Sequence, residues 1–160
     1  MPRKPPGNRL WLAAALAMPI VANAQGSNAH RMDVEARVDA IVASVSALQA
    51  GAGFTTPVGT YLRSGMVTGV GAGRDGLSGR IDFINRFHLD PFREHRWAPY
   101  GGGGLSARFD ESRLGRVYLL VFAGVDGPVH HGFTTSVEAG LGGGGRIGVI
   151  IRRAAAERRR

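Results

Sequence analysis

The sequence contains no cysteine, and its only lysine is Lys4. Without cysteine the chain forms no disulfide and carries no lipid anchor on an N-terminal cysteine. No Gly-Lys-Ser/Thr motif occurs, so a P-loop is excluded. Long hydrophobic runs are also missing: the apolar stretch at 10–22 has thirteen residues, fewer than the ~20 that a transmembrane helix requires.

That apolar stretch has the features of a secretory signal peptide. It follows the basic residues Arg3, Lys4 and Arg9, and it leads to small residues at Ala22 and Ala24. A basic start, a short apolar run and an A-x-A site are typical of a cleaved signal. We therefore expect a signal peptide at 1–24, a linker at 25–31, one domain at 32–153 and a basic tail at 154–160.

Positive charge is concentrated at the two ends of the chain. The formal net charge is +8, yet residues 25–151 hold twelve arginines and eleven acidic residues, a net of +1. The body therefore lacks the basic surface that nucleic-acid binding needs. No nucleic-acid partner is expected. The basic tail at 154–160 is expected to be a disordered, solubilising end, with contact to anionic lipid headgroups as the alternative.

The remainder of the chain alternates between apolar and polar residues in short runs. Turn signals such as "TTPVG" (55–59), "RDG" (74–76) and "DGP" (126–128) separate these runs. This spacing is typical of an all-β domain built from hairpins. It predicts eight strands at 32–42, 46–54, 59–72, 77–89, 98–109, 116–126, 133–142 and 144–153, which we interpret as an antiparallel up-and-down barrel.

The segment 32–49 is open to a second interpretation. Val34 and Val38 alternate with polar residues, as in a strand. Together with Ile41, Val45 and Leu48, however, they also follow helical spacing. The strands that follow favour a strand here, and a helix is the alternative.

Glycine is abundant, with 25 residues, and two runs of four occur at 101–104 and 142–145. Glycine inside a strand marks a sharp bend or a close backbone approach. We interpret both runs as barrel corners at which an interior side chain is absent. A phosphate-binding loop is the rejected alternative, because no helix follows either run.

Each strand has one apolar face and one face that carries charges of both signs. In a soluble barrel the apolar face points inward, whereas in an outer-membrane barrel it points to lipid. An interior filled by paired arginines and carboxylates fits the narrow lumen of eight strands. The predicted lumen charge network comprises Glu35, Arg37, Asp39, Arg80, Asp82, Arg86, Arg108, Glu138 and Arg146.

Aromatic residues cluster near connections that the strand count places at one end of the barrel. Membrane interfaces favour aromatic side chains at strand ends, and Phe109 marks the opposite rim. The predicted interface aromatics are Phe54, Tyr61, Phe87, Phe92, Trp97, Tyr100 and Phe133.

The strands "WAPYGGGGLSARF" and "EAGLGGGGRIGVIIRR", behind a signal peptide, resemble those of the small outer-membrane β-barrel domain proteins of Gram-negative bacteria. The resemblance implies an integral outer-membrane protein with a structural or interaction role, with membrane lipid as its surroundings and an unidentified envelope protein as a possible partner. The alternative is a soluble periplasmic barrel or sandwich that binds a small apolar ligand.

No catalytic, cofactor or metal site is predicted. His130 and His131 are adjacent and point apart in an extended chain, and the spacing in "FHLDPFREHRW" (87–97) is loose for a metal. Asp82 and Glu138 are interpreted as counter-ions of arginine and not as an acid pair. We expect no enzymatic activity.

Overall fold

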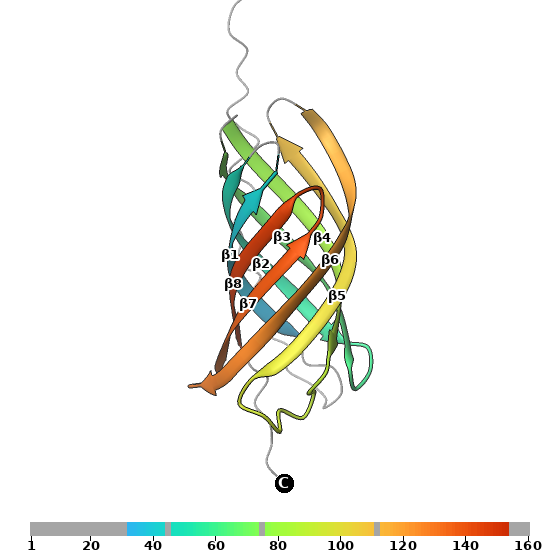
Figure 1. The fold of residues 1–160 in the computed structure, drawn as a ribbon, viewed down its shortest axis with the longest axis vertical. Coiled ribbons are helices and arrows are strands. Elements are labelled where there is room, and N and C mark those ends of the chain that lie inside the picture. The colour runs from blue at the N-terminus through green and yellow to red at the C-terminus, as the bar shows by residue number, and fades with distance from the viewer. Residues whose placement is uncertain (1–31, 44–45, 74–75, 111–112, 154–160) are drawn as a thin grey trace, which may run out of the picture.

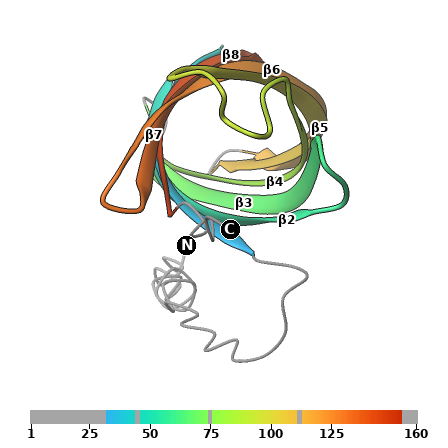
Figure 2. The ribbon, with the colours of Figure 1, turned by 90° about the horizontal axis from the view of Figure 1, so that it is seen from below.

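The computed structural model describes residues 32–43, 46–73, 76–110 and 113–153, with the side chains of Arg113 and Leu114 excepted. The predicted signal peptide, linker and basic tail lie outside these residues. Eight antiparallel strands close into a barrel in chain order (Figures 1 and 2). They are β1 (Asp33–Val42), β2 (Ala47–Pro57), β3 (Leu62–Gly73), β4 (Gly76–His88), β5 (Ala98–Asp110), β6 (Arg113–His130), β7 (Phe133–Leu141) and β8 (Gly145–Arg153).

The barrel closes because the first and last strands pair. Val38 of β1 lies opposite Ala50 of β2 on one side and opposite Val149 of β8 on the other. Every edge strand of an open sheet would leave backbone groups unpaired, and closure removes those edges. The predicted all-β barrel of eight strands is confirmed, and 32–49 forms two strands and not a helix.

Strand β6 is longer than the sequence indicates. The predicted turn at "DGP" lies within this strand, where the β6–β7 ladder shifts register between Asp126 and Val129. Such an irregularity accommodates a proline that cannot donate to the ladder. The chain turns instead at His131 and Gly132, whose φ angles are 50° and 80°.

The two glycine runs have different roles. The run 101–104 lies within β5, where a Cβ on Gly102 would collide with the Asn85 carbonyl oxygen and approach Phe122 Cζ to 2.5 Å. The second run lies mainly in the β7–β8 turn, where Gly143 and Gly144 have φ of 71° and 149°. The corner interpretation therefore fits the first run, while the second supplies the positive φ that a tight turn requires.

The barrel has an inverted distribution of polarity. Among the described residues, sixteen buried side chains are polar or charged and eight are apolar. The outer face carries the large apolar side chains, with Phe83 60%, Ile147 63%, Val117 66% and Leu119 73% exposed. Arg80 and Arg146, in contrast, are 2% and 3% exposed. None of the described residues forms a helix of the length and apolarity needed to cross a membrane.

Two ends of the barrel can be distinguished by their connections. The terminal end, where β1 begins and β8 finishes, carries the connections 58–61, 89–97 and 131–132. At the opposite end β1, β3 and β5 finish and β2, β4 and β6 begin, and the connection 142–144 joins β7 to β8. Seen from the terminal end, the 89–97 connection lies across part of the barrel mouth (Figure 2).

Candidate functional site: the charged interior of the barrel

Five arginines and five carboxylates form hydrogen-bonded ion pairs inside the barrel. Alternation places residues two apart on the same side of a strand, so "EARVD" (35–39) directs three charged side chains inward from β1 alone. We call the ten residues the interior charge network. They are Glu35, Arg37, Asp39, Arg80, Asp82, Arg86, Asp126, Glu138, Arg146 and Arg152.

Glu138 of β7 is the centre of this network. Its Oε1 accepts hydrogen bonds from Arg37 Nη2 at 2.8 Å and Arg146 Nη2 at 2.9 Å. Its Oε2 accepts from Arg86 Nη2 at 3.3 Å and from Tyr100 Oη at 3.1 Å. These donors come from β1, β8, β4 and β5, so one carboxylate connects side chains across the full width of the lumen.

A second group of contacts lies toward the opposite end. Asp39 receives both Nε and Nη2 of Arg37 at 2.7 Å, a bidentate pair, and it also pairs with Arg80. Asp82 binds Arg146 Nη1 at 2.7 Å and lies 3.3 Å from Arg80 Nε. Each charge that is removed from water therefore has an opposite charge within hydrogen-bond distance, which is the condition for burying it.

The third group lies toward the terminal end and adds Asp126 and Arg152 to the predicted network. Arg152 donates from Nη1 to Asp126 at 2.8 Å and 3.1 Å, and from Nε to Glu35 at 3.2 Å. Ser136 donates to Asp126 at 2.6 Å. Asp126 ends the predicted strand 116–126, and Arg152 lies in the predicted strand 144–153. The alternation within each strand already places both side chains on the inner face.

Tyr100 departs from its predicted position at the membrane interface. Its side chain is 2% exposed and lies within the lumen. The guanidinium carbons of Arg86 and Arg152 each lie 5.1 Å from its ring centroid, a favourable cation–π geometry. The reason is parity: Tyr100 shares the inner face of β5 with Ser106, although it stands near the end of the strand.

Arg108 takes a different partner from the other predicted network residues. Its Nη1 donates to the Gly143 carbonyl at 3.3 Å, and its guanidinium carbon lies 5.7 Å from the Tyr118 ring centroid. It thus lies near the opposite mouth of the barrel, beyond the paired charges.

The other six predicted interface aromatics are exposed on the outside of the barrel or in its connections. Tyr61 and Phe87 stack with ring centroids 5.7 Å apart. Phe109 is likewise exposed, next to the last residue of β5 at the opposite end. The exposed set is Phe54, Tyr61, Phe87, Phe92, Trp97 and Phe133.

His88 and His95 do not lie at a common site. His95 Nδ1 lies 3.3 Å from Asp90 Oδ2 in the connection, while His88 Nδ1 faces Asp126 inside the barrel at 3.7 Å. Within the described ranges, no three His, Asp or Glu side chains are arranged to hold a metal ion.

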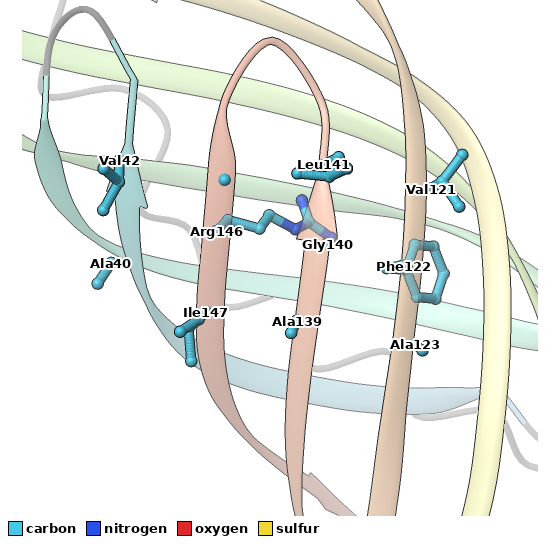
Figure 3. Close-up of a pocket in the computed structure, with 11 residues that line it drawn as sticks. Ala40, Val42, Val121, Phe122, Ala123, Ala139, Gly140, Leu141, Arg146 and Ile147 are labelled. Atoms are coloured by element: carbon cyan, nitrogen blue, oxygen red, sulfur yellow. The ribbon is translucent and has the colours of Figure 1, made fainter.

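The outer wall carries a shallow apolar groove of about 580 Å³ across β6, β7, β8 and β1 (Figure 3). Small side chains form its floor, with Ala40 and Ala139 each paired opposite Ile147. Val121 and Leu141 flank it. Arg146 of the interior charge network and Phe122 also belong to its lining.

Together these features define a class of fold: a closed, eight-stranded antiparallel barrel with a charged interior and an apolar exterior. No family model and no curated protein matches the sequence.

Solved structures with the same architecture do match. One, described as de novo design of transmembrane β-barrels, has a TM-score of 0.57 and 16% identity, covering 76% of this chain and 92% of that chain. The N-terminal β-barrel domain of OprF from Pseudomonas aeruginosa has a TM-score of 0.55 and 13% identity, covering 76% and 96%. The designed barrel TMB2.3 has a TM-score of 0.52 and 14% identity, covering 78% and 94%. At these identities the likeness establishes the fold.

Proposed function

We propose that this protein is an integral outer-membrane β-barrel with a structural or interaction role and no enzymatic activity. The observation that carries the proposal is the inversion of polarity. An exterior on which Phe83, Val117 and Leu119 are each more than half exposed is suited to hydrocarbon and not to water. The likeness to designed transmembrane barrels supports the same environment.

The interior charge network further supports a barrel that does not conduct solutes. An eight-stranded barrel has a lumen just wide enough for its own side chains. Here Arg86 of β4 and Glu138 of β7 meet at 3.3 Å across that lumen. A solute would have to break these buried ion pairs to pass. We therefore propose a plugged barrel and not a porin.

The soluble alternative requires an apolar interior for its ligand. Buried apolar side chains form one small cluster, Val67, Ile84, Tyr100, Leu120 and Phe122, and the interior charge network occupies the space beside it. No observation within the described residues favours a ligand there.

Two measurements test the proposal. After extraction of cell envelopes with alkaline carbonate, the protein should remain with the membrane pellet, and release into the supernatant would contradict integral insertion. Reconstituted into a planar lipid bilayer, it should give no stepwise conductance, whereas steady ion-conducting steps would contradict the plugged lumen.

A further inference from the structure

One stretch of β6 has a neighbouring strand on only one side. Its pairing with β5 continues through Tyr118, Val117 and Arg116 as far as Arg113, which lies opposite Asp110. Its pairing with β7 starts only at Val121, opposite Leu141. In Figure 1 the β7–β8 hairpin ends below the tip of the β5–β6 hairpin. In the described part of the chain, residues 115–120 therefore have no ladder partner on this side. The β7–β8 turn reaches the lower part of this stretch, because the Cβ position of Gly142 lies 3.6 Å from Leu120 Cα and that of Gly143 lies against the Tyr118 ring. The open strand edge is therefore 115–117.

The direction of the backbone groups at this edge follows from two neighbours. The Leu120 carbonyl oxygen points to β5, lying 2.9 Å from the Cβ position of Gly103, while that of Leu119 lies 3.7 Å from the Cβ position of Gly142. Along an antiparallel strand, successive residues direct their N–H and C=O groups to opposite sides. The backbone groups of Gly115 and Val117 thus face the open edge, whereas those of Leu119 face the β7–β8 turn.

The same residues carry the most lipid-suited side chains of the strand. Val117 and Leu119 are 66% and 73% exposed and point outward. This step rests on the proposed function: in hydrocarbon, each unpaired backbone donor or acceptor costs several kcal/mol. An apolar edge with free backbone groups is the pattern to which an added strand pairs.

At the terminal end, the chain itself covers the edge of β6 that has no β5 partner. At the terminal end, β6 extends past its pairing with β5, which begins at Ala98 and Asp126. There Arg93 of the 89–97 connection donates to the Gly127 carbonyl at 3.5 Å, and Trp97 lies beside Gly127. No described segment does the same for 115–117, where the β7–β8 turn does not reach.

Charge indicates which strand would fit. Arg116 shares its side of β6 with Tyr118 and Leu120, is exposed, and makes no side-chain hydrogen bond or ion pair with any described residue. Arg108, its partner in the β5–β6 register, donates to the Gly143 carbonyl. A neighbouring strand would therefore meet guanidinium groups on its polar side. A second copy paired edge to edge would bring two Arg116 side chains to the same face, which is unfavourable.

We propose that the open edge of β6 binds an extended segment of a partner protein whose side chains alternate between apolar and acidic. Its backbone pairs with Gly115 and Val117, its apolar side chains continue the outer face, and its carboxylates face Arg116.

The test uses the full chain in lipid nanodiscs and a short, end-blocked peptide of alternating valine and glutamate. The matched control is the same peptide with lysine in place of glutamate. Backbone amide hydrogen exchange is followed by NMR. The acidic peptide should slow exchange at Gly115 and Val117 by about tenfold or more, corresponding to at least about 1.4 kcal/mol, and the lysine peptide should not.

Two variants separate backbone pairing from charge. Val117→Pro removes an N–H that faces the open edge and spares the β5 ladder, so peptide protection at Gly115 should be lost. Arg116→Glu should make the barrel bind the lysine peptide in preference to the glutamate peptide. This variant tests the inference even if the proline variant does not fold.

Equal effects of both peptides, or no effect of either, would overturn the inference. Protection without peptide that rises with protein concentration would identify a second copy as the occupant and overturn it as well. A chain that does not associate with nanodiscs would instead contradict the proposed function, so the two failures are distinguishable.

Discussion

At the residue scale, Glu138 is the side chain whose removal should lower the free energy of unfolding most. It is buried and accepts hydrogen bonds from three arginines and a tyrosine. Glu138→Gln leaves those guanidinium groups without their shared counter-charge, so we expect the free energy of unfolding to fall by about 3–5 kcal/mol.

Denaturant unfolding in lipid vesicles measures this change. The control is Val137→Leu on the outward face of the same strand, which should change stability by less than about 0.5 kcal/mol. Equal stability of Glu138→Gln and the parent would show that the network does not hold the barrel together.

Glycine at 124 makes room for Tyr100. A Cβ there would collide with the tyrosine ring and lie 2.7 Å from the Val137 carbonyl oxygen. Gly124→Ala should therefore destabilise the barrel by about 1–3 kcal/mol. Gly59→Ala is the matched control, because nothing lies within 4 Å of the added methyl. Thermal unfolding of both variants in detergent tests the difference, and indistinguishable midpoints would contradict it.

At the scale of the element, the 89–97 connection is fixed by Asp90. Its carboxylate accepts the backbone N–H of Glu94 at 3.1 Å and of His95 at 2.9 Å. The backbone N–H of His95 is the main reason that the pKa of Asp90 lies below its ordinary value of 3.8. Because the folded pKa is lowered, the stabilisation is complete above the ordinary value and is lost as pH falls through the folded pKa.

The NMR signal of the His95 amide should accordingly keep its folded position at pH 3.8 and move only at lower pH. Asp90→Ala should abolish that folded position at every pH, while Glu94→Ala should preserve it. Movement of the parent signal above pH 3.8 would contradict the role of Asp90.

The elements differ in how far the sequence predicts them. Alternation alone locates all eight strands and directs Glu35, Arg37 and Asp39 to one face, because side-chain parity is a local property. The true end of β6 is not local: Gly127 and Pro128 are turn residues by type, and only the ladder to β7 keeps them in a strand. The prediction for Tyr100 is wrong because it rests on how close the residue is to the strand end. The parity of Tyr100 along β5 instead directs its side chain into the lumen.

At the scale of the whole molecule, the interior charge network should be what closes the lumen. Arg86 and Glu138 meet across it from opposite walls. Replacing both with alanine removes one charge of each sign together with two long side chains. We expect the double variant to conduct ions in planar bilayers, and the parent to be silent.

The control pair is Phe87→Ala with Val137→Ala, two outward positions, and it should remain silent. A silent Arg86→Ala, Glu138→Ala variant that still migrates as a folded barrel would show that other side chains close the lumen.

The central claim is that hydrocarbon surrounds the outer face. The absence of cysteine makes single-cysteine variants unambiguous, so nitroxide labels can be placed at Phe83, Val137 and Ile147 in lipid vesicles, with Gly59 as the loop control. Electron paramagnetic resonance should find the three outer-face labels accessible to oxygen, which concentrates in lipid, and shielded from a water-soluble nickel chelate, with the reverse at Gly59. Nickel accessibility at all three outer positions would place that face in water and contradict the account.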